Sequence, residues 1–277
     1  MANKHLLVNE VKVSIEQKIE NNGPSTYRTI GAGQDLVLIH GWGVNSNIWA
    51  PVVEQLSEHY CVHLVNLPGF SDEPALETYS LANIAHRLLA DLPQKAIWCG
   101  WSLGGLIATY IAYHYPERVG KLIQVCTALK FVEEAQWLGV KKEVFSAFKS
   151  GVVKQPQKTL NRFLSLLAMG SETVKTDIAT IKHLMSDQPE GNASALLGGL
   201  VLLDEVDLRQ EFSQLSMPSL TILGEHDNLV SVANKPKLIE LSSTNQQVIF
   251  QKSSHAPFIS EPILFHQVLI SFIGSQK

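Results

Sequence analysis

The stretch AIWCGWSLGG (residues 96–105) decides the fold of this 277-residue chain. Its apolar first half is typical of a buried strand, and apolar residues at helical spacing begin at Leu103. Ser102 is therefore predicted to lie on a sharp turn between a strand and a helix. The small residues two positions before and after it let the two backbones approach closely. The five letters G-x-S-x-G are common by chance, so it is this strand–turn–helix context that indicates a nucleophilic serine rather than a structural turn.

Apolar runs on either side of this stretch repeat the pattern of the strand. They are continuous rather than alternating, which is typical of parallel strands that are buried on both faces. The runs cover residues 36–40, 61–67, 121–126, 219–224 and 247–251. Helical periodicity marks residues 103–114, and a closing helix is expected around residues 263–272. We predict the α/β fold class, with a mostly parallel central sheet flanked by helices.

The regular alternation of strand and helix stops between residues 129 and 212. Only helical patterns occur there, with breaks expected at Gly139, Gly151, Gly170 and residues 189–191. We therefore expect an all-helical lid (residues 129–212), inserted into a core formed by residues 1–128 and 213–277. Residues 1–30 are a less regular extension, and a short edge strand or hairpin is expected before about residue 33.

A serine hydroxyl needs a base within hydrogen-bond reach and an acid that orients the base. In a fold of this kind both partners follow later strands, in the order serine, acid, histidine. Asp227 follows the strand 219–224 in GEHDNLV, and His255 follows the strand 247–251 in KSSHAPF. Asp204 and Asp207 are the alternative acids, but they precede a strand and are expected to be helix-terminal or solvated.

Hydrolysis of an ester also needs hydrogen-bond donors for the oxyanion. The backbone N–H of Leu103 directly follows the serine, at the positive end of the predicted helix. A second donor is expected from the loop HGWG (residues 40–43), with the N–H of Trp42 as the candidate. The alternative is that HGWG is only a turn.

Six sequence blocks, HGWG, NLPGF, GWSLGG, HYPERV, GEHDNLV and SSHAPFISEP, resemble those of the α/β-hydrolase family in their order and spacing. The resemblance covers residues 31–273, nearly the whole chain. The roles that it implies are those of nucleophile for Ser102, base for His255, orienting acid for Asp227, and oxyanion donors for Trp42 and Leu103.

HGWG together with GWSLGG, RFLSLLAMGSET and HAPFISEP resembles one branch of this family more closely. That branch consists of esterases of biotin synthesis, whose substrate is a methyl-esterified acyl chain held on acyl-carrier protein. The resemblance implies a serine carboxylesterase with acyl-carrier protein as its partner. The implied substrate contacts are Trp42, Ser102, Leu103 and His255, together with the lid run Phe163, Leu164, Ser165, Leu166 and Leu167.

The charge distribution independently suits an acidic partner. The net charge of the chain is −4, but residues 141–182 carry +5 and the remainder −9. Lys154, Lys158 and Arg162 recur at intervals of four and are expected to share one helix face, with Lys175 adding to the positive charge. We interpret these four residues as a docking surface for the carrier protein. The alternative is a solvated face without a partner.

Other classes of protein are disfavoured by composition. The acidic balance argues against nucleic-acid binding, and glycines interrupt the uncharged stretch 96–116, so a strand–turn–helix is expected there rather than a membrane span. The three cysteines, Cys61, Cys99 and Cys126, are expected to be buried, reduced thiols. We see no motif for a metal or cofactor, and expect a cytoplasmic monomer.

The fold alone does not choose among reactions of the same site. A broad-specificity short-chain esterase, a thioesterase, a lactonase, a carbon–carbon bond hydrolase and a perhydrolase stay open as alternatives, as does a receptor that uses the pocket only for binding. A complete serine, histidine and aspartate set disfavours the receptor, since a protein that only binds needs no strained turn at its serine.

Overall fold

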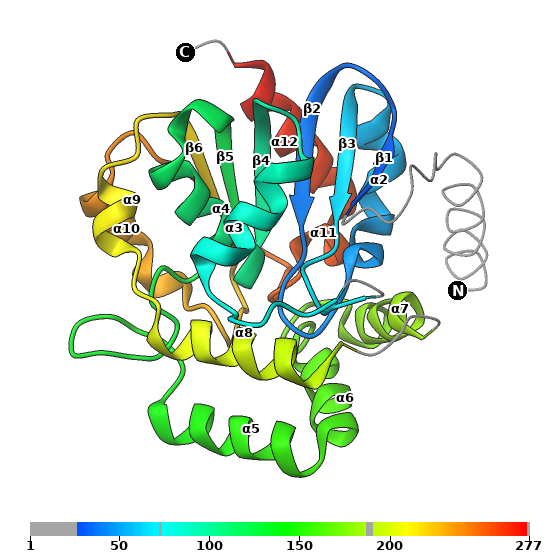
Figure 1. Cartoon of the computed structure of the whole chain (residues 1–277), viewed down its shortest axis with the longest axis vertical. Coiled ribbons are helices and arrows are strands. Elements are labelled where there is room, and N and C mark those ends of the chain that lie inside the picture. The colour runs from blue at the N-terminus through cyan, green and yellow to red at the C-terminus, as the bar shows by residue number, and fades with distance from the viewer. Residues whose placement is uncertain (1–26, 72–73, 187–190, 276–277) are drawn as a thin grey trace.

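The computed structural model describes residues 27–71, 74–186 and 191–275, and their strands form one twisted sheet (Figure 1). The strand order is β1-β3-β2-β4-β5-β6-β7. Only the edge strand β1 runs antiparallel to its neighbour β3, and all other pairs are parallel. The strands are Tyr27–Ile30 (β1), Gln34–Ile39 (β2), Tyr60–Val65 (β3), Ala96–Trp101 (β4), Val119–Val125 (β5), Ser219–Gly224 (β6) and Gln246–Phe250 (β7).

The predicted mostly parallel sheet is confirmed, and each of the six apolar runs forms a strand. Every residue of β4 and β6 is buried, as continuous apolar strands between two layers of helices require. The edge strand or hairpin expected before about residue 33 rests on the loose alternation of Val11, Val13 and Ile15, which lie outside the described residues. Within the part of the extension that is described, β1 forms the sheet edge.

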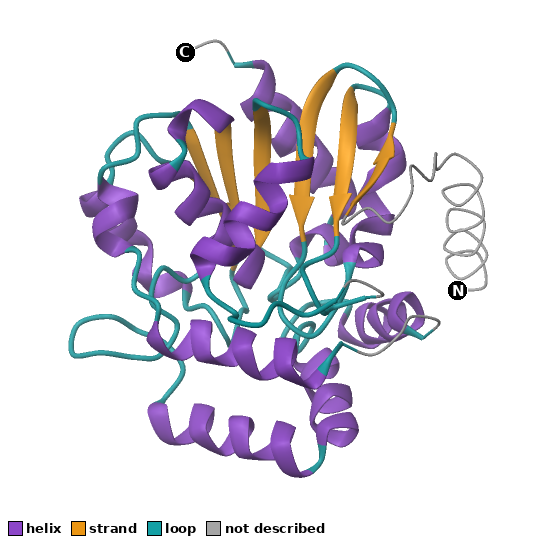
Figure 2. Ribbon diagram, in the orientation of Figure 1, coloured by secondary structure: helices purple, strands orange, loops and turns teal. Residues whose placement is uncertain are grey.

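Helices cover both faces of the sheet (Figure 2). Helices α3 and α4 contact each other on the near face in Figure 1, while α2, α11 and α12 contact one another behind it. The core helices are Ala50–Ser57 (α2), Leu81–Asp91 (α3), Leu103–His114 (α4), Lys235–Leu241 (α10), Pro257–Ser260 (α11) and Pro262–Gly274 (α12), with 3-10 turns at Ser46–Trp49, Pro116–Arg118 and Val232–Asn234. The predicted helices after Ser102 and at the C-terminal end are both present.

The described residues between β5 and β6 form five helices: Lys142–Lys154 (α5), Pro156–Leu166 (α6), Val174–Met185 (α7), Ala193–Glu205 (α8) and Arg209–Ser213 (α9). Helices α5, α6 and α8 lie beyond the carboxyl ends of the strands in Figure 1, whereas α9 contacts α4 and α10 beside the sheet. The described part of residues 129–212 contributes only isolated bridges to β-structure. Helices therefore cover the edge of the sheet where the loops that carry the predicted site residues emerge.

The predicted break at Gly151 is wrong, because α5 continues through it to Lys154. A Cβ at Gly151 would lie 2.9 Å from Thr159 Oγ1, so the glycine permits the close approach of α5 and α6. The chain turns instead at Gln155, whose φ of −145° is typical of a residue before proline. The other described breaks lie outside helices, at Gly139, Gly170 and Gly191.

The break at Gln155 also corrects the expected helix face of basic residues. Lys154 is the last residue of α5, while Lys158 and Arg162 lie on α6. The spacing of four therefore spans two helices, because Pro156 has no N–H for a continuous helix and begins α6 instead. Only Lys158 and Arg162 share a helix.

In the described part of the chain, no helix combines the length and apolar character that crossing a bilayer requires. The uncharged stretch 96–116 divides between β4 and α4, as expected.

Candidate active site

Ser102 lies on a strained turn between β4 and α4. Its φ of 54° and ψ of −117° are disfavoured for any residue with a side chain. A Cβ at Gly100 would lie 2.2 Å from the Gly104 carbonyl oxygen, and one at Gly104 would lie 2.5 Å from that of Ile39. The Ser102 N–H donates to the Val125 carbonyl at 2.9 Å, which ties the turn to β5. The glycines are thus needed for close packing, and the turn holds the serine at the carboxyl end of the sheet.

Asp227 and His255 form a hydrogen bond that is almost fully buried. His255 Nδ1 and Asp227 Oδ2 are 2.7 Å apart, and the side chains are 1% and 0% exposed. The second carboxylate oxygen accepts the N–H groups of Leu229 and Val230 at 2.8 and 3.0 Å. These backbone donors orient the carboxylate, so Nδ1 carries the proton that it donates to Asp227.

The second ring nitrogen of His255, Nε2, is available to accept a proton. This atom is buried and has no hydrogen-bond partner among the described residues. The main chain of His255 is held by two contacts: Trp101 Nε1 donates to the His255 carbonyl at 2.7 Å, and the His255 N–H donates to the Leu167 carbonyl at 3.2 Å. The ring is therefore held in place with one nitrogen ready to accept a proton. Within the described residues no hydrogen bond joins it to Ser102, as is common before substrate tightens such a site.

The two expected oxyanion donors lie next to the serine. A Cβ at Gly41 would lie 3.2 Å from Ser102 Cβ, so the HGWG backbone reaches the turn. A Cβ at Gly199 of α8 would lie 2.7 Å from Trp42 Cδ1 and 3.3 Å from Leu103 Cδ2. Among the described residues, neither the Trp42 N–H nor the Leu103 N–H donates to another backbone carbonyl. Both amides are therefore available to a ligand oxygen.

His40 is a further site residue, and the HGWG motif alone indicates no role for its side chain. It is fully buried; its Nε2 accepts the Leu67 N–H at 3.0 Å, and its Nδ1 donates to the Gly41 carbonyl at 2.7 Å. Burial lowers the pKa of His40 to about 4, so the ring is neutral at pH 7. It joins the loops that follow β2 and β3 and so positions the Trp42 amide. Its place directly after an apolar strand is the signal that could have identified it.

Cys126 is also beside the buried pair. Its Sγ lies within 4.8 Å of ligand atoms of Asp227 and His255. Its φ of 43° is unusual for a residue other than glycine. Burial raises the pKa of the thiol, and the Asp227 carboxylate raises it further, so the thiol stays protonated. All three cysteines are free, as expected, although Cys61 is only partly buried.

An apolar cavity of about 80 Å³ lies against Trp42. The Trp42 ring packs edge-on against Phe163 and Phe148, with centroids 4.9 and 5.4 Å apart, and its Nε1 donates to the Leu196 carbonyl. The cavity is lined by Trp42, Phe131, Val140, Val144, Phe145, Phe148, Phe163, Leu166, Leu200, Leu203 and Leu229. The cavity is an apolar surface next to Trp42, whose N–H is the expected oxyanion donor.

The run Phe163 to Leu167 does not face one surface. Phe163 and Leu166 line this cavity, whereas Ser165 lines an outer groove and Leu164 another hollow. Leu167 contacts the site through its carbonyl, which accepts the His255 N–H. Five consecutive residues point in all directions around a helix, because each turns by about 100° relative to the last.

The outer groove carries the positive charge. It has a volume of about 770 Å³ and is lined by Gln157, Lys158, Asn161, Arg162, Ser165, Leu166, Met169 and Lys182. Among the described residues, Lys158, Arg162 and Lys182 have no ion-pair partner. Lys154 and Lys175 do not line it. Lys182 is the base that the expected docking surface omitted.

The alternative acids have other partners. Asp204, near the end of α8, pairs with Lys149 of α5. Asp207 pairs with the guanidinium of Arg209. In the described part of the structure, neither carboxylate bonds to a histidine, in contrast to Asp227.

The strand order of the sheet, the strained turn at Ser102 and the buried pair of His255 and Asp227 are together typical of one class of protein. A family model of the alpha/beta hydrolase fold matches residues 36–262. The chain therefore belongs to the α/β-hydrolase family. Among its relatives is the pimeloyl-[acyl-carrier protein] methyl ester esterase of Vibrio vulnificus, 43% identical over 90% of this chain and 97% of the relative. The esterases of that name from Vibrio cholerae and Aeromonas salmonicida are 41% and 42% identical, over 89% and 88% of this chain and 96% and 97% of their own.

Solved structures of more distant sequence share the fold. An esterase from Exiguobacterium antarcticum superimposes with a TM-score of 0.80 at 22% identity, and covers 90% of this chain and 96% of its own. The enol-lactonase from Burkholderia xenovorans LB400 gives 0.77 at 20% identity, with the same coverage. The names of these two proteins differ in reaction, so the likeness shows the fold alone.

Proposed function

We propose that this chain is a serine carboxylesterase that hydrolyses the methyl ester of pimeloyl-[acyl-carrier protein], releasing methanol and the free acid for biotin synthesis. The observation that carries the proposal is the buried Asp227–His255 hydrogen bond beside the strained Ser102 turn. It occurs in a chain 43% identical to an esterase named for this substrate.

In the proposed mechanism, Ser102 Oγ attacks the ester carbonyl while His255 Nε2 takes its proton. Asp227 stabilises the imidazolium that forms, since its carboxylate already accepts Nδ1–H at 2.7 Å. The N–H groups of Trp42 and Leu103 bind the oxyanion. His255 then protonates the departing methoxide, and methanol leaves the acyl-enzyme. A water molecule, activated by the same nitrogen, adds to the acyl carbon and releases the acid and Ser102.

We further propose that residues 129–212 act as a lid and that the carrier protein docks on its basic groove. Lys158, Arg162 and Lys182 line the groove, and their charge suits an acidic protein. A second hollow of about 280 Å³ shares Gln157, Asn161 and Lys182 with the groove and reaches Gly43, the residue after Trp42. This continuity offers a tethered acyl chain a path from the docking surface towards the oxyanion loop. Lys154 and Lys175 would supply charge around the groove rather than contacts within it.

Replacing Ser102 with alanine tests the catalytic role. We expect a loss of about 10⁶-fold in turnover of a pimeloyl methyl ester, by analogy with serine proteases. Labelling by a fluorophosphonate should disappear in the same variant. Ser165→Ala, a serine on the outer groove, is the matched control and should keep the labelling. A Ser102→Ala protein with nearly normal esterase activity would disprove the mechanism.

The substrate is tested separately from the nucleophile. A panel of methyl esters, thioesters and lactones should rank the methyl ester of a dicarboxylic acyl chain first. The gene should also restore growth of a biotin auxotroph that lacks its demethylating esterase. Preference for thioesters or lactones, with labelling of Ser102 intact, would favour another reaction of the same site. Absence of labelling in the native protein would favour a receptor.

We also propose that the enzyme acts as a monomer in the cytoplasm. Light scattering on the purified chain and fractionation of expressing cells test the two parts.

A further inference from the structure

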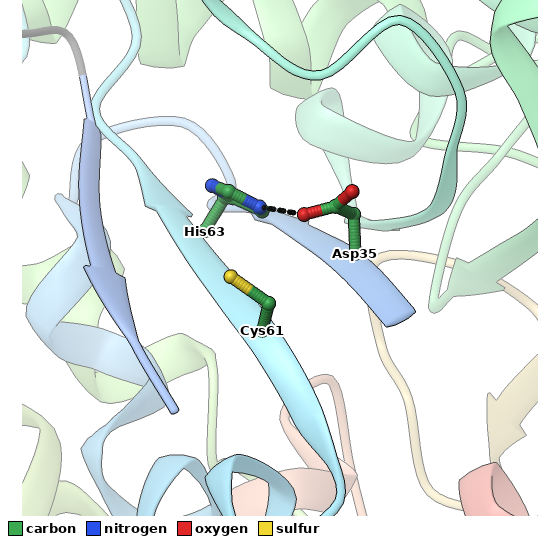
Figure 3. Close-up of side chains that lie close together, drawn as sticks. All are labelled: Asp35, Cys61 and His63. Atoms are coloured by element: carbon green, nitrogen blue, oxygen red, sulfur yellow. Dashed lines mark hydrogen bonds and ion pairs between the residues drawn. The ribbon is translucent and has the colours of Figure 1, made fainter. Parts of the chain in front are cut away.

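A second cluster of reactive side chains lies on β2 and β3, towards the amino ends of these strands, whereas Ser102 follows the carboxyl end of β4. It consists of Asp35 near the start of β2, and Cys61 and His63 on β3 (Figure 3). One ligand atom from each residue lies within 4.8 Å of those of the other two. From Asp35 to Ile39, where β2 ends, four residues span about 13 Å, so Asp35 is well separated from the carboxyl edge of the sheet where Ser102 lies.

The register of the sheet brings these three residues together. Asp35 pairs directly with Cys61 across the parallel strands, and His63 lies two residues further along β3, on the same face as Cys61. His63 Nε2 and Asp35 Oδ1 are 2.7 Å apart, and Figure 3 shows the Cys61 thiol beside this pair. The positions are set by backbone pairing, so the cluster is preorganised.

The other ring nitrogen of His63 also has a hydrogen-bond partner, which orients the ring. His63 Nδ1 is 3.2 Å from the hydroxyl of Thr29 on β1. A hydroxyl can donate or accept, so this contact serves both tautomers of the ring. With the proton on Nε2, the ring donates to Asp35 and accepts from Thr29. With the proton on Nδ1, it donates to Thr29 and presents a lone pair at Nε2.

We propose that Asp35, Cys61 and His63 form a binding site for Zn²⁺. Thiolate, imidazole and carboxylate are the ligand types that this ion takes in proteins, and three protein ligands leave a fourth position for water. The Asp35 side chain is 34% exposed and the His63 side chain 7%, so the ion would enter from the Asp35 side. On binding, the Cys61 thiol gives up its proton to solvent and the His63 proton moves to Nδ1. The two anionic ligands then balance the charge of the ion.

Zinc bound there would link β2 to β3 far from the catalytic groups. It would stabilise the folded chain, because an ion that binds only the folded state shifts unfolding to higher temperature. Ester hydrolysis at saturating substrate should not change when zinc fills this site alone, since among the described residues none of its three ligands hydrogen-bonds to Ser102, Asp227 or His255.

Calorimetric titration of the full chain with Zn²⁺, after removal of metals by a chelator, tests the proposal. The titration is done on the native protein and on Asp227→Asn, since Cys126, Asp227 and His255 form a second possible ligand set. We expect one equivalent to bind in Asp227→Asn and the temperature of unfolding to rise with zinc. His63→Gln and Cys61→Ser should weaken binding by about 100-fold or more, and Thr29→Val by about 10–100-fold.

Cobalt gives a second readout that identifies the ligand. Co²⁺ in the site should show a thiolate charge-transfer absorption that is lost in Cys61→Ser and kept in Cys99→Ala, whose thiol is buried in β4. Asp35→Asn is a conservative change at a partly exposed position. Zinc binding can therefore still be tested with this variant if Cys61→Ser or His63→Gln misfolds. Zinc binding that is equal in Cys61→Ser, His63→Gln and the native chain would overturn the proposal. So would the absence of any binding to Asp227→Asn.

Discussion

At the scale of single residues, the site depends on positions where few side chains would fit. A Cβ at Gly105 would lie 1.9 Å from Thr127 Oγ1, and the neighbouring Gly104 is equally enclosed by the β2 backbone. These contacts explain why the small residues around Ser102 occur where they do. His40 illustrates the same point for a polar group, because its neutral ring satisfies a donor and an acceptor in two different loops.

His40 makes stability depend on pH in a predictable direction. Burial lowers its pKa from the usual 6.5 to about 4, so between these values the unfolded chain binds a proton that the folded chain does not. Stability from this group is complete above pH 6.5 and is lost as pH falls towards 4. We expect His40 to lower the free energy of unfolding by about 3 kcal/mol between pH 7 and pH 4, and urea unfolding at the two pH values measures this loss.

His40→Gln is the matched variant for this measurement, since it removes the titrating group and keeps hydrogen-bonding capacity. The native chain should lose more stability than His40→Gln on acidification. Parallel pH profiles of the two proteins would contradict the assignment.

At the scale of elements, the break between α5 and α6 decides which charges act together. Pro156 separates Lys154 from Lys158, and the groove instead brings Lys182 of α7 next to the bases of α6. The proposed docking surface is thus formed by two consecutive helices, α6 and α7. Helix α8 also brings together residues that are distant in sequence, since its Gly199 packs against both Trp42 and Leu103.

Reversing the charge of the groove should separate docking from catalysis. We expect Lys158→Glu with Arg162→Glu to lower kcat/KM for the carrier-linked ester by about 10-fold or more at low salt, because charge complementarity steers association. Turnover of a short soluble methyl ester should be unchanged. The difference should shrink as salt screens the charges.

The matched control is Lys235→Glu with Lys237→Glu on α10, which makes the same change of charge outside the groove. It should affect neither substrate. An equal loss on both substrates in the groove variant would count against the docking surface.

At the scale of the whole molecule, a buried carboxylate joins the helices outside the sheet to the core. Asp177 of α7 is 2% exposed and accepts the hydroxyls of Ser171 at 2.7 Å, Thr173 at 2.9 Å and Ser260 of α11 at 2.8 Å. Since α11 directly follows the loop that carries His255, this network fixes α7 relative to that histidine.

Asp177→Ala should therefore destabilise the whole chain. It leaves three hydroxyls without their shared acceptor, and hydrogen bonds to a charged group contribute about 1.5–3 kcal/mol each at most. We expect a loss of about 2–4 kcal/mol in the free energy of unfolding, measured in urea. Glu172→Ala, which removes only an exposed ion pair with Lys252, should change the midpoint little. Equal midpoints for both variants would refute the role of Asp177.

Much of the fold could be predicted from local pattern. The six apolar runs and the helices after Ser102 and near the C-terminal end were identified because burial and periodicity are encoded residue by residue. Asp227 and His255 were chosen by their places after strands, and the structure brings them into contact. Two predictions were wrong: the break at Gly151, and the helix face shared by Lys154 and Arg162. Both relied on the spacing of residues in the sequence, whereas the packing of α5 on α6 and the turn before Pro156 decide where these helices end.

The amino-acid sequence by itself determined the parallel sheet, the serine turn and the order of the loops that carry Ser102, Asp227 and His255, since each follows from short-range pattern and backbone sterics. Only the tertiary structure decided which nitrogen of His255 is available, which side chains line the cavity and groove, and that Asp35, Cys61 and His63 meet. Those features depend on the register and packing of segments far apart in the chain, which no local spacing specifies.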